Sequence, residues 1–221
     1  MGIQVVGAGG AVAEVGEFTA APLHITTKPV PADGHYRVTH RCVLVNTQAA
    51  NSRLFEIRQP TAGKLLILTR LLVKWLNSSA HTAIIEDSLD CFKVTTFTAV
   101  DTTNTVTLAS SLKRTSMTAD IAVIRGVTVA GAAAGMTGGT LTKDAGPWAQ
   151  LPRILNVTVE ATTETTSRVA DTMEALDPGE DTHPFVFAQN EGFIIENRVL
   201  LGAAAGSSVY IDCSYAIADA Y

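Results

Sequence analysis

Short stretches rich in β-branched and aromatic residues, separated by turn-forming segments, recur along most of the chain. Thr alone accounts for 28 of the 221 residues, and Val and Ile are also frequent. Because β-branched side chains suit a pleated, half-buried surface, this pattern favours strands over helices. We expect strands over residues 36–45, 53–58, 65–75, 91–99, 105–108, 121–129, 155–160, 192–200 and 208–216.

Clusters of Pro, Gly, Asp and Ser between these stretches mark turns. Examples are Pro31-Ala32-Asp33-Gly34, Asp177-Pro178-Gly179 and Ala205-Gly206-Ser207. Many strands divided by turns are typical of an all-β sandwich or barrel. The sequence therefore predicts an all-β fold, a jelly-roll-like β-sandwich. We expect residues 202–206 to form a hairpin loop that connects the last two strands.

Two of the expected strands carry enough alternation to assign a buried face. Over residues 36–45 that face contains Tyr36, Val38, His40, Cys42 and Leu44. Over residues 65–75 it contains Leu65, Ile67, Thr69, Leu71, Val73 and Trp75. The second segment is apolar on both strand faces, so a helix over residues 65–76 remains an alternative.

Three segments do not have the pattern of a packed core. Residues 1–22 are small, apolar and Gly-rich and predict an extended N-terminal arm, which leaves residues 23–221 for the β-sandwich domain. Residues 130–146 are a Gly/Ala-rich stretch that we expect to be a long loop. Residues 161–182 are Thr-rich and then acidic, with a weak helix signal over residues 167–175. Loops of this length are often functional.

Charge and composition limit the classes of partner. The chain has 16 Lys and Arg against 21 Asp and Glu, a formal net charge of −5. Nucleic-acid-binding surfaces are usually basic, so we expect no nucleic-acid partner. No run approaches the roughly 18 uncharged apolar residues of a membrane span, so we expect no membrane partner. Cys42, Cys91 and Cys213 lie far apart, and we expect buried free thiols.

The sequence contains fragments of ligand-binding motifs, but each is incomplete. Residues 3–11 resemble the strand-to-turn opening of a dinucleotide-binding unit, yet Val12 occupies the third glycine position and no βαβ alternation follows. Glu180, Asp181 and His183 are candidate metal ligands, for which a polar surface loop is the favoured interpretation. A second acidic group consists of Glu86, Asp87 and Asp90. Its sequence is equally compatible with a carboxylate cluster and with a solvated loop. We therefore predict no enzyme, no cofactor and no metal.

The two ends of the chain carry a further similarity. The first end comprises Met1-Gly-Ile-Gln-Val-Val-Gly-Ala-Gly-Gly-Ala-Val-Ala-Glu-Val15, Leu23-His-Ile-Thr-Thr-Lys-Pro-Val30 and Gly34-His-Tyr-Arg37. The second comprises His183-Pro-Phe-Val-Phe-Ala-Gln-Asn-Glu-Gly-Phe-Ile-Ile-Glu-Asn-Arg-Val-Leu200 and Ser208-Val-Tyr-Ile-Asp-Cys-Ser-Tyr-Ala216. These segments resemble virion structural proteins of tailed bacteriophages. The resemblance implies an N-terminal arm, a β-sandwich body and a structural role such as capsid decoration.

The first hypothesis is therefore a non-enzymatic phage decoration (cement) protein that stabilises the head by binding the capsid surface as an oligomer. Its partners would be the major capsid protein or other virion proteins, and the resemblance implies a homo-oligomer, with a trimer at a threefold position. We expect it on the capsid surface of the virion, and in the host cytoplasm during assembly. An apolar arm can add a strand to a neighbour's sheet. The candidate contact residues are Ile3, Val5, Val6, Val12, Val15 and Trp148.

Two alternatives stay open. A tail, baseplate or receptor-binding component would place Trp148 and residues 130–146 at a glycan surface, whereas we expect Trp75 to fill the core. A small metal-dependent enzyme on a β-sandwich would use Asp181, His183 and Glu180.

Overall fold

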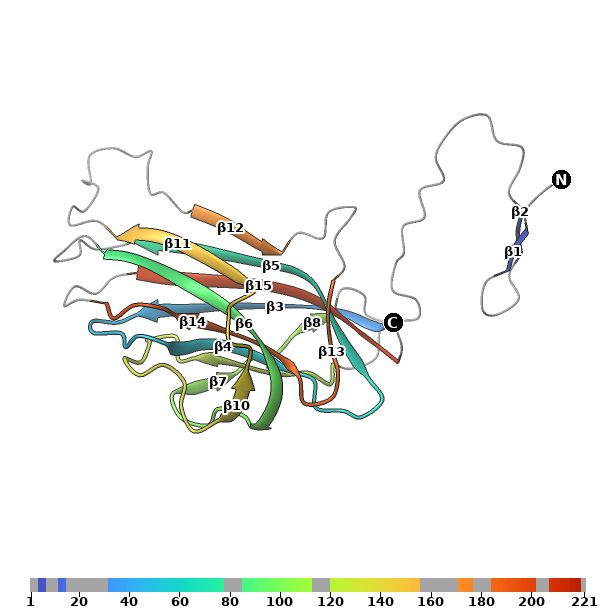
Figure 1. Ribbon diagram of the computed structural model, residues 1–221, viewed down its shortest axis with the longest axis horizontal. Helices are drawn as coiled ribbons and strands as arrows, with labels where there is room; N and C mark the ends of the chain where they lie inside the picture. The colour runs from blue at the N-terminus through green and yellow to red at the C-terminus, as the bar shows by residue number, and fades with distance from the viewer. Residues whose placement is uncertain are drawn as a thin grey trace, which may run out of the picture.

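The computed structural model describes residues 4–6, 12–14, 32–77, 85–112, 120–155, 171–176, 184–201 and 207–219. These residues form strands and no helix, arranged in two large antiparallel sheets and one two-stranded sheet (Figure 1). The all-β prediction is confirmed, and the helix alternative for residues 65–76 is wrong because they form strand β5 (Leu65–Asn77). Within the described residues, no helix has the length and hydropathy needed to cross a membrane.

The six-stranded sheet is built on three long strands. Strand β15 (Ser207–Ala218) lies at its centre and pairs with β3 (Ala32–Leu44) on one side and β5 on the other. Shorter strands complete the edges of this sheet: β12 (Asp171–Leu176) and β13 (Phe185–Phe187) beside β5, and β8 (Ser111–Leu112) beside β3.

The seven-stranded sheet repeats this arrangement. Strand β14 (Gly192–Asn197) lies between β4 (Ser52–Arg58) and β6 (Ile85–Ala99). The other strands of this sheet are β10 (Thr140–Lys143) and β11 (Ala149–Leu155) beside β6, and β9 (Val123–Val127) followed by β7 (Thr105–Thr107) beside β4.

The long strands alternate between the two sheets along the chain. Strands β3 and β5 belong to the six-stranded sheet, β4 and β6 to the seven-stranded sheet, and the last two strands, β14 and β15, lie at the centres of opposite sheets. The predicted hairpin between the last two strands is therefore wrong. Both strands are buried along almost their whole length. A central position with a partner on each edge satisfies their backbone groups, which a hairpin alone would not.

The core fills the space between the two sheets. The alternating residues of β3 from Tyr36 to Leu44 are buried as predicted, and Trp75 fills the core. Phe187 of one sheet packs on Phe193 of the other, with ring centroids 6.1 Å apart. Cys42, Cys91 and Cys213 are buried thiols outside any disulfide, as expected.

Strand β5 departs from the predicted face. Its register with β15 shifts between Leu68 and Arg70, so Thr69 is an extra residue in the strand. Such a bulge reverses the faces on either side of it. Leu71 accordingly faces the main core, whereas Ile67 belongs to a separate cluster with Ala216 and Ala218. The prediction that Ile67 and Leu71 share a face is wrong for this reason.

Short edge strands account for the remaining differences. The expected loop over residues 130–146 contains β10 and the buried Met136. Strand β12 forms where the sequence has a weak helix signal, because the edge of β5 supplies its backbone partners. Strand β11 ends at Leu155, where a strand was expected to begin, and residues 156–160 lie outside the described part. Edge pairing of this kind depends on tertiary context more than on local propensity.

Candidate functional site

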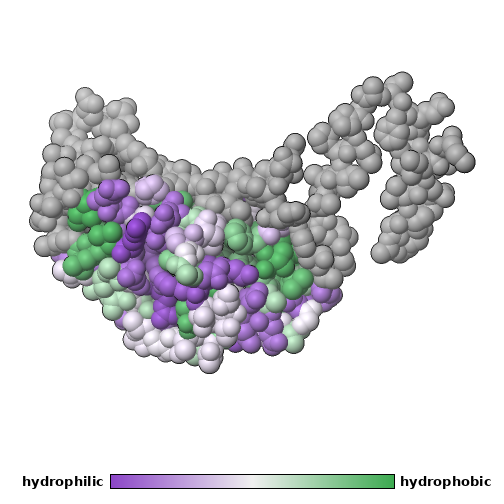
Figure 2. Space-filling view, in the orientation of Figure 1, coloured by the Kyte–Doolittle hydropathy of each residue, from purple (hydrophilic) through white to green (hydrophobic). Residues whose placement is uncertain are grey.

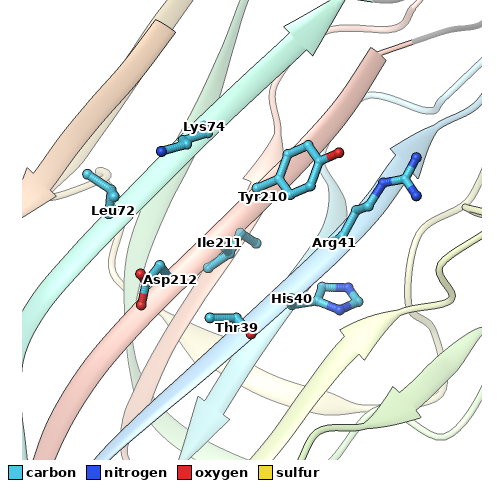
Figure 3. Close-up of a pocket in the computed structure, with 8 residues that line it drawn as sticks. All are labelled: Thr39, His40, Arg41, Leu72, Lys74, Tyr210, Ile211 and Asp212. Atoms are coloured by element: carbon cyan, nitrogen blue, oxygen red, sulfur yellow. The ribbon is translucent and has the colours of Figure 1, made fainter. Parts of the chain in front are cut away.

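The outer face of the six-stranded sheet carries a shallow depression of about 270 Å³ (Figure 3). Strand alternation creates it, because the neighbours of the buried residues in β3, β15 and β5 point outward. The outward side chains that line it are Thr39, Arg41, Leu72, Lys74, Tyr210 and Asp212.

Tyr210 is the central residue of this depression. Its backbone lies opposite Arg41 of β3 and Lys74 of β5 in the two strand registers. Figure 3 shows its ring between these two cationic side chains, and the Arg41 guanidinium carbon lies 5.7 Å from the ring centroid. Tyr210 is 38% exposed, one of three large hydrophobic residues exposed in the described part of the chain.

An ion pair borders the depression. Arg37 Nε donates a hydrogen bond to Asp212 Oδ1 at 2.8 Å, and a terminal guanidinium nitrogen of Arg37 pairs with Asp212 Oδ2. This two-point contact holds the Asp212 carboxylate in a fixed orientation beside Tyr210. The hydrogen bond and the charge of Asp212 raise the pKa of Arg37.

Positive charge concentrates on this face. Its outward residues on β3 and β5 include Arg37, Arg41, Arg70 and Lys74, all exposed. The acidic residues are Asp212 on β15 and Glu174 on β12, whose register position is opposite Leu72. The chain as a whole has a net charge of −5. The depression is therefore a locally basic surface on an acidic protein, a combination that favours anionic ligands.

A second group of charged residues lies on the outward side of the seven-stranded sheet and is buried. The backbone N–H of Asp101 donates to Glu56 Oε1 at 3.1 Å, and Arg53 pairs with Asp101 Oδ1 at 2.8 Å. The N–H of Gly139 donates to the same Asp101 oxygen at 2.9 Å. These contacts join β4 to the end of β6 and to the turn before β10.

The Glu56–Asp101 pair shares one buried environment. Glu56 Oε2 and Asp101 Oδ2 have no hydrogen-bond partner among the described residues. Burial, followed by the charge of Asp101, raises the pKa of Glu56 to about 7. The Arg53 guanidinium already occupies the cationic position beside Asp101. We therefore interpret Glu56, Arg53 and Asp101 as a structural group that holds strands together rather than a cation site.

The acidic residues 86–90 lie on β6, so their interpretation as a solvated loop is wrong. Asp87 is buried, and its Oδ1 accepts hydrogen bonds from the backbone N–H groups of Ser88 at 2.8 Å and Val199 at 3.0 Å. Burial raises the pKa of Asp87 to about 6. Asp90 accepts a hydrogen bond from the Ser88 hydroxyl at 2.6 Å. Both carboxylates thus satisfy local donors.

Trp148 joins the two sheets at their edge. Its ring lies 4.7 Å from the Phe185 ring of β13 and meets Phe193 of β14 edge-on at 6.3 Å. Its backbone N–H donates to the carbonyl of Cys91 at 2.9 Å. This packing favours a structural contribution, and a contact of Trp148 with a partner stays a prediction.

The other candidate contact residues belong to the N-terminal segment. Val5 and Val6 lie on β1 (Gln4–Val6) and Val12 on β2 (Val12–Glu14), two strands that pair with each other in antiparallel register. Ile3 and Val15 lie outside the described residues, as do the candidate metal ligands Glu180, Asp181 and His183. The described residues contain no group of three or more His, Cys, Asp or Glu placed to hold a metal ion.

Sequence reasoning missed the basic depression, whose residues come from three strands that are distant in the chain. One signal was present: Tyr210 stands between Val209 and Ile211, so alternation turns an aromatic ring outward.

Figure 2 shows that the face of the molecule turned toward the viewer has a hydrophilic band between hydrophobic patches.

Comparison of the sequence with known protein families and with curated proteins finds no match.

Proposed function

We propose that this protein is a non-enzymatic structural component of a tailed-phage virion, a capsid decoration protein that binds the head surface as an oligomer. The observation that carries the proposal is the strand order of the two sheets. One sheet has the order β3, β15, β5 and then β12 with β13, and the other has β4, β14, β6 and then β10 with β11.

We interpret this order as a jelly roll in which β7, β8 and β9 are inserted after β6 along the chain and pair at the outer edges of β3 and β4. The first four long strands alternate between the sheets, and the last two insert between them. Two interlocked Greek keys produce such an order. Jelly rolls form viral capsid domains and lectin domains, and the resemblance of both chain ends to phage virion proteins favours the first use.

The chemistry of the described polar residues supports a structural function. Asp101, Asp87 and Glu56 each receive backbone hydrogen bonds that hold strands and turns together. The depression at Tyr210 is shallow and opens onto a sheet face (Figure 3). A surface of this shape is better suited to binding than to the exclusion of water that most catalysis requires.

In this proposal the N-terminal segment and the sandwich act together. Residues 1–22 attach to a neighbouring subunit, and the oligomer, a trimer at a threefold position, engages several capsid subunits at once. Tethering turns contacts that are individually weak into stable attachment. The protein then belongs on the capsid surface, after synthesis in the host cytoplasm.

Add-back to heads that lack the protein tests this function. Virions from a deletion mutant of the gene are mixed with the full chain or with a variant lacking residues 1–20, and pelleted with the heads. We expect the full chain to co-sediment and to raise the temperature at which heads release DNA. The truncated variant should fold, as judged by circular dichroism, but bind weakly. Failure of the full chain to bind these heads would reject the decoration function.

A tail or receptor-binding component is the second candidate, and the exposed Tyr210 between two cations favours it as a ligand-binding face. Immunogold labelling of intact virions separates the two functions, because label confined to tails is compatible only with the second.

A further inference from the structure

We propose that the depression around Tyr210 binds a carboxylated sugar, such as a uronic or sialic acid residue of a surface polysaccharide. This site does not depend on the decoration function, since it rests only on the side chains of this sheet face. The strand register places an exposed ring, two cations and two polar groups on this face.

The tyrosine ring offers the apolar component. One face of a pyranose ring is made of C–H groups, and such a face packs on an aromatic ring while its hydroxyls stay in contact with water. Tyr210 stands on the central strand of the sheet, and its ring is partly exposed. Leu72 extends the apolar surface on the neighbouring strand, where it lies opposite Asp212 in the register.

The two cations set the width of the site. Arg41 and Lys74 lie on the strands either side of Tyr210, so their backbones are two strand spacings, or about 10 Å, apart. The ring of Tyr210 lies between the two side chains, so a sugar stacked on that ring has a cation on either side for its carboxylate. Charge-assisted hydrogen bonds from a guanidinium or an ammonium group to a carboxylate are stronger than neutral ones. The neutral counterpart of the sugar should therefore bind more weakly.

Asp212 and Thr39 provide partners for hydroxyl groups. The Asp212 carboxylate is held by Arg37, and a carboxylate oxygen retains lone pairs after one hydrogen bond. Thr39 is exposed and lies opposite Asp212 in the register of β3 with β15. Together they place an acceptor and a hydroxyl in the same depression as Tyr210 (Figure 3).

The size of the depression favours a sugar over a macromolecular anion. Its volume of about 270 Å³ is close to the lower end of small-molecule sites, and it is open to solvent. An acidic peptide or a nucleic acid would need a longer row of cations than one ring-sized hollow supplies. We expect weak binding of a single sugar at an open site of this size, and oligomerisation strengthens attachment to a polysaccharide.

Saturation-transfer NMR with the full chain tests the site. The probes are the methyl glycosides of glucuronic acid, galacturonic acid and N-acetylneuraminic acid, with methyl glucoside as the neutral control and a poly-glutamate peptide as the competing anion. We expect at least one carboxylated sugar to bind about tenfold more tightly than methyl glucoside and the peptide. Its affinity should fall as salt is added, because exposed charges are screened.

Variants locate the binding. Tyr210→Ala and the double variant Arg41→Gln with Lys74→Gln should each weaken the affinity about fivefold or more, whereas Tyr210→Phe, which keeps the ring, should retain it. Arg198→Gln removes one charge from an exposed residue elsewhere and should leave binding unchanged. Circular dichroism confirms that each variant is folded. Absence of binding by all three acidic sugars, unchanged affinity in Tyr210→Ala, or tighter binding of the peptide would overturn the proposal.

Discussion

Replacement of Glu56 by Gln tests whether the buried carboxyl pair makes the fold sensitive to pH. Glu56 is fully buried beside Asp101, and its pKa is raised from 4.5 to about 7. Between these two pH values the unfolded chain releases a proton that the folded protein keeps. The protonated Glu56 therefore contributes its full stability to the fold below a pH of about 4.5. This contribution is lost as the pH rises to about 7.

The magnitude follows from the width of this interval. Each pH unit within it lowers the free energy of unfolding by about 1.4 kcal/mol, so the total loss approaches about 3 kcal/mol. Gln has the shape of Glu and stays neutral, so it avoids this loss while its Oε1 still accepts the Asp101 N–H. We expect Glu56→Gln to match the wild type near pH 5 and to exceed its stability by up to about 3 kcal/mol near pH 8. Because Asp101 shares the environment, this value is an upper limit.

Urea unfolding followed by tryptophan fluorescence measures the difference directly. Wild type and variant are compared at intervals from about pH 5 to about pH 8. The matched control is Glu86→Gln, which removes the same charge from an exposed position on β6 and should follow the wild type at every pH. A stability difference between Glu56→Gln and wild type that stays constant over the whole range would refute the raised pKa of Glu56.

Three further perturbations probe the packing. A Cβ on Gly192 would lie 1.9 Å from the carbonyl oxygen of Ile57, so Gly192→Ala should lower stability by about 3 kcal/mol or more, seen as a reduced Tm; an unchanged Tm would contradict the close approach of β14 to β4. Trp148→Ala should lower the free energy of unfolding in urea by about 2–3 kcal/mol, because the ring joins both sheets. A smaller loss of stability together with lost binding to the capsid would instead favour the prediction that Trp148 contacts a partner. Burial raises the pKa of the Cys42 thiol to about 12 and that of Cys91 well above its ordinary range. A thiol reagent at about pH 8 should therefore label these cysteines only on unfolding, and rapid labelling of the native protein would show that the core is open.

Alternation was a reliable guide where a strand is long and has a polar outer face. In β3, buried residues from Tyr36 to Leu44 alternate with Arg37, Thr39 and Arg41, and the predicted face is confirmed. In β5 both faces are apolar, so no local signal marked the bulge at Thr69, which only the pairing with β15 defines. The hairpin prediction failed for a similar reason, since local turn chemistry does not record which sheet the next strand joins.

The candidate site was harder to predict than the fold. Arg41, Lys74 and Tyr210 are brought together by two strand pairings that span most of the chain, and a single sequence contains no direct record of those pairings. The buried group of Glu56, Arg53 and Asp101 was equally hard to predict from the sequence. Asp101 follows a strand and is an ordinary loop residue by composition, yet it is fully buried because Arg53 and Gly139 approach it from distant segments.

Cryo-electron microscopy of virions from the culture that makes this protein tests the central claim most directly. If the protein decorates the capsid, the reconstruction should contain the two-sheet body on the outer surface of the head, repeated by the capsid symmetry and with the N-terminal segment against a neighbouring subunit. The structural function would be contradicted if the outer surface of the heads lacked this density and mass spectrometry found no copy of the protein in the particles.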